Sequence, residues 1–308
     1  MNKFDGHAIL DRARTLLSQG TVVQYIPELK KVDPSLLGYC IVDVDGNTLS
    51  FGDAQIKFTI QSISKVITFT CCLMDRSLEE IKERVTFEPT SSAFNAISDL
   101  ENKNAHRPLN PYLNAGAFSV LSLMKRESFE QCFEQVLDLL RLMTGNSSLT
   151  YNRSAYLSAY QTAYRNRSLL YYMQSTGILD KDTDIEALLD AYCKICCIEM
   201  TAQELAALSL VYAQKGYSSL SGKQCFDPKI ASIVNATVML CGMYDESGET
   251  AVSVGLPCKS GVGGGLMAVA PGRMGIGIFG PALNAKSNSI GGMSILEQLS
   301  EELDLTIF

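Results

Sequence analysis

Ser62-Ile63-Ser64-Lys65-Val66-Ile67-Thr68-Phe69-Thr70-Cys71-Cys72-Leu73-Met74 places a hydroxyl and an amine at the start of a continuous apolar segment. The segment is too uniformly apolar for a surface helix and predicts a buried one. Residues three apart share a helix face, so Ser62 and Lys65 are expected side by side. A lysine whose pKa is lowered by burial can take the proton of a serine hydroxyl, which makes the pair a candidate acyl-transfer site. The alternative is that Ser62 only caps the helix.

Two predicted hairpins lie near opposite ends of the chain. Residues 37–44 and 48–51 alternate as strands around an Asp45-Gly46 turn. Residues 266–270 and 274–279 flank the turn Pro271-Gly272-Arg273 in the same way. An antiparallel sheet assembled from both ends of the chain is therefore expected.

The segment between the hairpins is predicted to be almost wholly helical. Its start signals are Ser128 with Gln131, Thr201 with Glu204, and Asp227 before Pro228, and its stop signals are Gly145, Gly177 and Gly216. A last amphipathic helix is expected over residues 287–303. These patterns predict an α+β fold, in which helices flank the antiparallel sheet and a helical lobe is inserted. The expected organisation is a single domain over residues 1–308, with lobes 1–75 plus 245–308 and 76–244, and a site at their seam.

A second motif, Lys259-Ser260-Gly261, opens the glycine-dense run Val262-Gly263-Gly264-Gly265. A lysine, a hydroxyl and bare backbone at the start of a strand are suited to binding a substrate carboxylate and to lending an amide to an oxyanion hole. The run lacks the spacing of a dinucleotide or phosphate loop and leads into a strand. A flexible glycine loop is the alternative. A second Ser-x-x-Lys, at residues 122–125, is predicted to be ordinary helix surface.

Composition excludes several classes of protein. The net charge of −7 comes without a basic cluster, which argues against nucleic acid as a partner. No apolar run is long enough to cross a membrane, and the start lacks the apolar part of a signal peptide, so a cytosolic protein is expected. Its ten cysteines are then expected to be reduced and buried, including the adjacent pairs at residues 71–72 and 196–197. With only His7 and His106, and with no Cys-x-x-Cys pair recognised as metal ligands, no metal centre is expected. A serine-histidine triad has only these two histidines as candidates, so a lysine is the better base.

The chain resembles the bacterial serine-dependent glutaminases, a family similar in fold to serine β-lactamases and penicillin-binding proteins. The resemblance extends over nearly the whole chain and rests on the segments Gln24-Tyr25-Ile26-Pro27-Glu28-Leu29, Val32-Asp33-Pro34, Gln61-Ser62-Ile63-Ser64-Lys65-Val66, Phe94-Asn95, Asn110-Pro111-Tyr112-Leu113-Asn114-Ala115-Gly116-Ala117, Arg165-Asn166-Arg167, Gly242-Met243-Tyr244, Val254-Gly255-Leu256-Pro257 and Lys259-Ser260-Gly261-Val262-Gly263-Gly264-Gly265. It implies hydrolysis of L-glutamine to L-glutamate and ammonia, without a cofactor, by a homo-oligomer (dimer or tetramer).

The same resemblance implies a role for each matching residue. Ser62 matches the nucleophile, Lys65 the general base, and the amides of Ser62 and Val262 the oxyanion hole. Four further residues match substrate-contacting positions: Asn114, Asn166, Tyr192 and Tyr244. Tyr192 is also expected to steer protons near Ser62, and Lys259 is expected to belong to the catalytic residues. Taken alone, Asn114 is equally suited to cap a helix that begins at Ala115, and either tyrosine to be a half-buried core aromatic.

One position breaks the family pattern where a carboxylate is expected to pair with the substrate's α-ammonium group. The family has a glutamate seven residues before the asparagine matched by Asn166, and this chain has Ala159, with no acidic residue from 151 to 174. Smaller departures are Leu109 in place of arginine and Ser91 in place of glycine. Three classes of function therefore remain open: a glutaminase, a serine amidohydrolase acting on another small amide, and a non-catalytic binding homologue. Penicilloyl chemistry ranks below these, because such enzymes work outside the cytoplasm.

Overall fold

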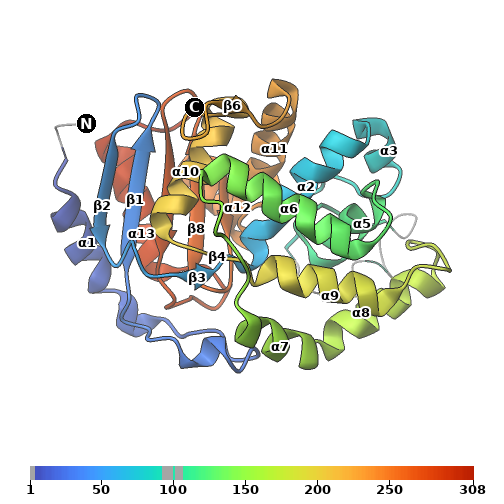
Figure 1. The fold of residues 1–308 in the computed structure, drawn as a ribbon. Coiled ribbons are helices and arrows are strands. Elements are labelled where there is room, and N and C mark those ends of the chain that lie inside the picture. The colour runs from blue at the N-terminus through green and yellow to red at the C-terminus, as the bar shows by residue number, and fades with distance from the viewer. Residues whose placement is uncertain (1–3, 92–99, 101–106) are drawn as a thin grey trace.

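The computed structural model describes residues 4–91, 100 and 107–308 (Figure 1). Its strands are β1 (Gly38–Asp43), β2 (Thr48–Gly52), β3 (Phe58–Thr59), β4 (Glu199–Met200), β5 (Tyr217–Ser218), β6 (Lys223–Gln224), β7 (Cys258–Ser260), β8 (Gly265–Ala270) and β9 (Met274–Phe279). Its α-helices are α1 (Gly6–Arg14), α2 (Ser64–Asp75), α3 (Leu78–Lys82), α5 (Asn114–Leu123), α6 (Phe129–Thr144), α7 (Arg153–Gln161), α8 (Tyr164–Ser175), α9 (Ile185–Cys196), α10 (Ala202–Ala213), α11 (Pro228–Cys241), α12 (Ser247–Ser253) and α13 (Ile290–Glu302). Short 3₁₀ turns η1 (Leu17–Gln19), η2 (Leu29–Lys31), η3 (Gln61–Ile63) and η5 (Tyr244–Glu246) complete the set. Phe94, Asn95 and His106 lie outside the described residues.

The main sheet confirms the predicted fold class. Its five strands run in the order β2-β1-β9-β8-β7, and every neighbouring pair is antiparallel. Strand β1 from the first hairpin pairs with β9 from the second, with Tyr39 opposite Ile278. Both predicted hairpins are therefore correct. Strands from the N-terminal and C-terminal parts of the chain, β1 and β9, lie side by side within one sheet (Figure 1).

Helices cover both faces of this sheet. Tyr39 and Ile41 of β1 join the apolar cluster formed with α1 and α13, whereas Cys40 and Val42 join the cluster that includes α10. Helix α10 lies very close to β9, because a Cβ atom on Gly277 would overlap the backbone of α10. The predicted division into two lobes stays a prediction. That division assigns α10 to the helical lobe, although α10 packs on the sheet.

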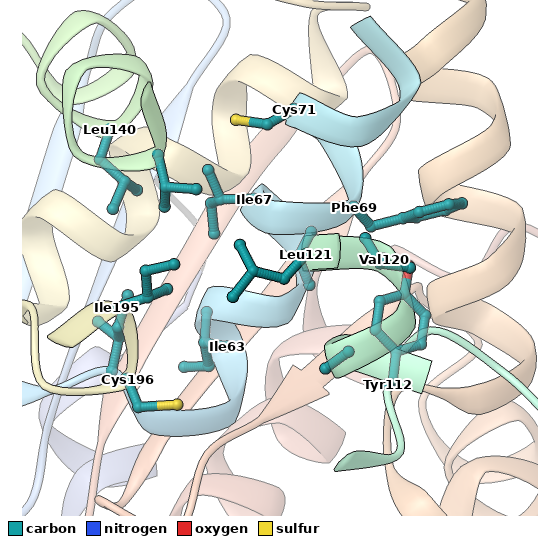
Figure 2. Close-up of a cluster of buried hydrophobic side chains, with 14 of the residues drawn as sticks. Ile63, Ile67, Phe69, Cys71, Tyr112, Val120, Leu121, Leu140, Ile195 and Cys196 are labelled. Atoms are coloured by element: carbon teal, nitrogen blue, oxygen red, sulfur yellow. The ribbon is translucent and has the colours of Figure 1, made fainter. Parts of the chain in front are cut away.

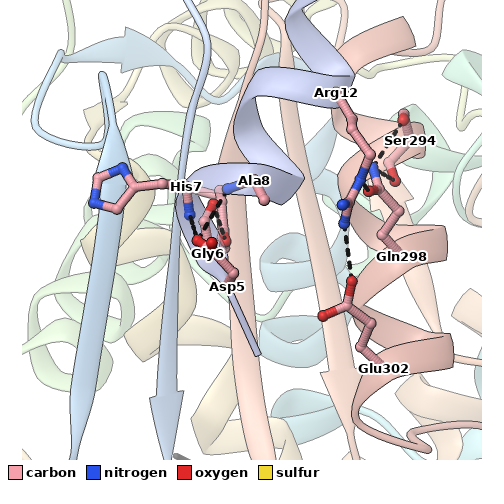
Figure 3. Close-up of polar contacts among 9 residues, drawn as sticks. Asp5, Gly6, His7, Ala8, Arg12, Ser294, Gln298 and Glu302 are labelled. Carbon is pink, nitrogen blue, oxygen red and sulfur yellow. Dashed lines mark hydrogen bonds and ion pairs between the residues drawn. The ribbon is translucent and has the colours of Figure 1, made fainter. Parts of the chain in front are cut away.

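Helices α1 and α13 pack against each other on the face of the sheet opposite α10 (Figure 3). Asp5 caps α1 by accepting hydrogen bonds from the amides of His7 and Ala8, each 3.1 Å long. The Arg12 guanidinium lies 2.9 Å from a carboxylate oxygen of Glu302. Because this ion pair is partly exposed, it contributes at most about 1 kcal/mol.

The last helix starts later than predicted. It begins at Ile290, because Ser287 has a left-handed φ of 71° that a helix does not allow, and Ser289 caps the helix by accepting from the amide of Gly292. The other helix signals are confirmed. Ser128, Thr201 and Asp227 cap α6, α10 and α11, and Gly145, Gly177 and Gly216 follow the ends of α6, α8 and α10 with positive φ.

Helix α2 is the predicted core helix. Its residues from Ser64 to Leu73 are all buried, and the helix packs against α5, α6 and α11. Figure 2 shows Ile63, Ile67 and Phe69 of this segment interleaved with side chains from α5, α6 and α9. This packing fixes the helix, and with it the Ser62–Lys65 turn, inside the molecule.

The remaining predictions concern residues outside the candidate site. The second Ser-x-x-Lys is surface, although α5 ends at Leu123, so Lys125 is an exposed residue beyond the helix. All ten cysteines are free and buried, as predicted. His7 is exposed beside Phe51. Among the described residues, no helix combines the length and apolar character that a membrane span requires.

Candidate active site

Ser62 lies in η3, the 3₁₀ turn that runs directly into α2. Its side chain is largely buried, with 7% of the residue exposed, and it lines a cavity. The residue that caps α2 is Ile63, which makes no side-chain capping bond, so the interpretation of Ser62 as a helix cap is wrong. Gln61 next to it holds a φ of 45°, a conformation that non-glycine residues adopt only when their surroundings enforce it.

The glycine-dense run packs tightly against the segment that precedes α2. A Cβ atom on Gly261 would overlap the carbonyl of Ile60, and one on Gly263 would overlap the carbonyl of Thr59. Only glycine permits this approach, which brings Val262 to the same cavity as Ser62. The alternative of a flexible glycine loop is therefore wrong.

Lys65 is buried beneath the cavity, with 1% of the residue exposed. Its Nζ donates to the carbonyl of Tyr112 at 3.0 Å and to Oδ1 of Asn114 at 2.7 Å. Burial lowers the pKa of the Lys65 amine to about 8, and the nearby Cys196 thiol opposes part of this change. The uncharged form of Lys65 therefore becomes more abundant as pH rises through that value.

Asn114 connects Lys65 to two other predicted site residues. Its Oδ1 also accepts from the Tyr192 hydroxyl at 3.2 Å, and its Nδ2 donates to Oδ1 of Asn166 at 3.0 Å. These partners orient the amide, because only the oxygen can face a lysine and a hydroxyl donor together. Asn114 is the first residue of α5 and Leu113 is its cap, so the capping interpretation of Asn114 is wrong.

Tyr192 and Tyr244 approach the site from α9 and η5. Both are buried, at 8% and 5% exposed, and burial holds the pKa of each phenol above its ordinary value, to about 12 for Tyr244. The Tyr244 hydroxyl interacts with the Ser62 side chain and donates to the carbonyl of Ser260 at 3.3 Å. Tyr244 has a φ of 56°, so this contact is held by a strained backbone.

Lys259 lies under Tyr244 and is fully buried. Its Nζ donates to the Ser260 carbonyl at 2.6 Å and lies 4.1 Å from the centre of the Tyr244 ring. Burial, and then the Lys65 amine, lower the pKa of Lys259 well below its ordinary value. Lys259 is not among the residues that line the cavity, so its contacts are with the cavity's supporting residues.

The cavity has a volume of about 330 Å³, a size suited to a small molecule. It is lined by Tyr25, Ile26, Gln61, Ser62, Asn114, Ala159, Thr162, Ala163, Arg165, Asn166, Tyr192, Cys193, Cys196 and Val262. Arg165 is the one charged residue in this described lining, and Ala159 faces the cavity from α7. A larger hollow of about 540 Å³, beside Cys71 and Arg126, contains none of the predicted site residues.

Sequence reasoning missed the six lining residues with polar or reactive groups that are not among the predicted site residues: Tyr25, Gln61, Thr162, Arg165, Cys193 and Cys196. Arg165 and Tyr25 lie in segments quoted for the family resemblance, but no spacing marks either as facing a cavity. Cys193 and Cys196 form a Cys-x-x-Cys motif, which the sequence-based consideration of metal ligands overlooked. That spacing was the available signal, since residues three apart on α9 share one face.

Comparisons with known proteins agree on one family. The family model described as "Glutaminase" matches residues 20–308. The chain is 48% identical over 301 residues to a glutaminase from Clostridium tetani (strain Massachusetts / E88), covering 98% of each protein. It is 44% identical over 300 residues to a glutaminase from Clostridium botulinum (strain Loch Maree / Type A3), covering 97% of this chain and 98% of that protein.

Solved structures give the same answer. A crystal structure of a Bacillus glutaminase superposes with a TM-score of 0.90 at 35% identity, covering 98% of both chains. The covalent complex of the Bacillus subtilis glutaminase YbgJ with 5-oxo-L-norleucine, formed by reaction with 6-diazo-5-oxo-L-norleucine, superposes with a TM-score of 0.89 at 34% identity over 98% of both chains. The fold is thus the β-lactamase-like fold of these enzymes. With nearly the whole sequence matched by the family model, by curated relatives and by solved structures, the chain belongs to the glutaminase family.

Proposed function

We propose that the protein hydrolyses L-glutamine to L-glutamate and ammonia through an acyl-enzyme intermediate on Ser62. The observation that carries this proposal is the convergence of a cavity-lining serine, a buried lysine with a lowered pKa and the packed glycine loop at one cavity. Family membership supports the substrate, and the covalent adduct of the Bacillus subtilis relative supports a nucleophile.

In the proposed mechanism, neutral Lys65 accepts the Ser62 proton as the serine oxygen attacks the side-chain amide carbon of the substrate. The amides of Ser62 and Val262 stabilise the oxyanion that forms. The leaving nitrogen takes the proton that Lys65 accepted and departs as ammonia, with Tyr192, whose hydroxyl donates to Asn114 Oδ1, steering this transfer. A water molecule then attacks the acyl-enzyme as Lys65, neutral again, accepts a proton from it. Lys65 returns that proton to the Ser62 oxygen as the ester bond breaks, which releases glutamate and restores both residues.

The other site residues have positioning and binding roles in this proposal. Asn114, Asn166, Tyr192, Tyr244 and the Val262 amide contact the substrate. Lys259, expected in the catalytic set, is a positioning residue in this proposal, because it packs against Tyr244 and donates a hydrogen bond to the Ser260 carbonyl. Arg165, which lines the cavity, supplies a positive charge for the substrate carboxylate.

The direct test is a coupled assay of ammonia release from L-glutamine, combined with reaction of the protein with 6-diazo-5-oxo-L-norleucine and peptide mapping of the adduct. Release of ammonia together with an adduct on Ser62 is the expected result. An adduct on Cys193 or Cys196, both of which line the same cavity, would refute the serine mechanism.

A prediction for the oxyanion hole compares two substitutions at Val262. The proposed donor is its backbone amide, so Val262→Ala is expected to reduce kcat only slightly. Val262→Pro removes the N–H and is expected to lower kcat by about 10²–10³-fold, the typical effect of losing one oxyanion donor. Steady-state ammonia assays give both values, with circular dichroism to verify folding. Equal losses in the two variants would show that Val262 acts by packing.

A second candidate function follows from the charges around the cavity. The described lining contains Arg165 but no carboxylate, and Ala159 faces the cavity where the family resemblance implies a glutamate. An α-ammonium group therefore meets no opposite charge in this lining. This composition favours a serine amidohydrolase of the same mechanism acting on a small amide that carries a carboxylate and no α-amine.

For Ala159→Glu, we expect improved kcat/KM for L-glutamine without improvement for glutaramate, its analogue without the amine. A close charge pair is typically worth about 2–5 kcal/mol, which corresponds to roughly thirtyfold to several thousandfold in recognition. Ala159→Gln is the matched control, since it adds similar volume without charge. If the wild type already has a much higher kcat/KM for L-glutamine than for glutaramate, and Ala159→Glu does not raise it further, then another group binds the substrate's α-ammonium.

A non-catalytic binding homologue is the least supported class. Such a protein has no need for a buried lysine whose pKa is lowered to about 8 beside a cavity-lining serine. The single-domain organisation, the cytosolic location and a homo-oligomeric state stay predictions, the last open to sedimentation measurements.

A further inference from the structure

Two thiols lie in the wall of the cavity that contains Ser62. Cys193 and Cys196 occupy successive turns of α9, and both line the cavity, with 4% and 6% of each residue exposed. Cys196 is close enough to Cys193 to act on it electrostatically. Cys197, the next residue, is fully buried and does not line the cavity.

Cys196 is in contact with the proposed catalytic residues. Its Sγ lies 3.7 Å from the Ser64 hydroxyl, and it interacts with the Tyr192 phenol and with the Lys65 amine. Figure 2 shows its sulfur directed from α9 toward the first turn of α2, below Ile63. A group bound at this sulfur would therefore occupy space beside Ser62.

We propose that Cys193 and Cys196 form a binding site for one soft, thiol-seeking metal ion, and that an ion bound there blocks amide hydrolysis. Thiolates are the ligands that soft ions select, and an i, i+3 pair on one helix face presents two of them together. Among the described residues, no group of three or more His, Cys, Asp or Glu side chains is arranged to hold a metal ion. The pair therefore suits an ion satisfied by two sulfur ligands better than zinc, which takes four ligands.

The chemistry of binding follows from the protonation of the thiols. Cys193 and Cys196 are free thiols. Binding of a divalent ion forms two metal–sulfur bonds and releases two protons to solvent. No oxidation is involved. The site is inhibitory, and no step of amide hydrolysis passes through it.

Mercury(II) is the probe that tests this site, because it is satisfied by two thiolates. One equivalent added to the whole protein is expected to remain bound through gel filtration, to produce near-ultraviolet mercury–thiolate absorption and to abolish most ammonia release. Added dithiol is expected to restore the activity. Loss of either thiol removes the chelate, so Cys193→Ala and Cys196→Ala are each expected to weaken binding by about 10²-fold or more.

The controls separate this site from the other buried thiols. Cys71→Ala and Cys225→Ala remove the thiols that line the larger hollow, and both are expected to keep the high-affinity mercury site. Each variant is compared with its own activity before mercury is added. Undiminished binding in both Cys193→Ala and Cys196→Ala, or bound mercury that leaves ammonia release unchanged, would overturn the proposal.

The proposed block of activity by the metal rests on the proposed function, in which Ser62 is the nucleophile. The Ser62→Ala variant tests the serine mechanism and the metal site separately. This variant keeps both thiols, so it is expected to bind mercury as the wild type does, measured by absorption and by metal content. If Ser62→Ala retains wild-type turnover, the serine mechanism fails while the metal site is still measured. If Ser62→Ala is inactive but neither it nor the wild type binds mercury at the pair, the metal proposal fails alone.

Discussion

Ser62→Ala is expected to abolish ammonia release, with kcat reduced by about 10⁴-fold or more, because catalytic nucleophiles cannot be replaced by their neighbours in the site. The substitution removes one oxygen from a side chain that lines the cavity and does not cap α2, so the fold is expected to be retained. The measurements are kcat from the coupled assay, and far-ultraviolet circular dichroism with thermal unfolding for the fold.

The chain contains its own control for this substitution. Ser122 belongs to the second Ser-x-x-Lys, and its hydroxyl donates to the carbonyl of Ser119 at 2.8 Å near the end of α5. Ser122→Ala is expected to retain nearly full activity, because the hydroxyl is bonded within α5 and Ser122 does not line the cavity. Wild-type turnover in Ser62→Ala would end the serine mechanism, and equal losses in both variants would indicate a general effect on folding.

The fold was largely predictable because its signals are local. Each signal depends on a few neighbouring residues: a turn flanked by strand residues, an apolar run, or a capping residue three positions before a glutamate. The Thr201–Glu204 capping box is an example of the last. The error at the last helix also has a local cause. Helical spacing continues back to Ser287, but the left-handed backbone at that residue is imposed by the loop before Ser289.

The site was predictable in part, through residues that motifs and family resemblance mark. The composition of the cavity was not, because its wall combines α7, α8, α9, the segment around Tyr25 and the glycine loop. That Arg165, Cys193 and Cys196 line one cavity becomes evident only from the packing of these elements in the folded protein. Lys259 shows the converse case, since its motif suggested a contact with substrate, whereas the fold buries the amine under Tyr244.

Lys65→Arg is expected to be nearly inactive, although it preserves a basic side chain. Burial lowers the pKa of Lys65 to about 8, so the neutral amine becomes more abundant as pH rises through that value. If the neutral amine is the base, wild-type kcat/KM rises with pH and levels off above an apparent pKa near 8. Arginine stays protonated across this range, so Lys65→Arg is expected to lose both the activity and the rise.

The contacts of Lys65 suit its proposed role as the base. A neutral amine has two N–H groups, which suit the bonds to the Tyr112 carbonyl and Asn114 Oδ1, and a lone pair, which in the proposed mechanism accepts the proton. Lys125→Arg, in the second Ser-x-x-Lys, is the matched control and is expected to leave the pH profile unchanged. If Lys65→Arg keeps most of its activity, Lys65 acts as a fixed charge, and Tyr192, which shares the Asn114 oxygen with it, becomes the next candidate for the base.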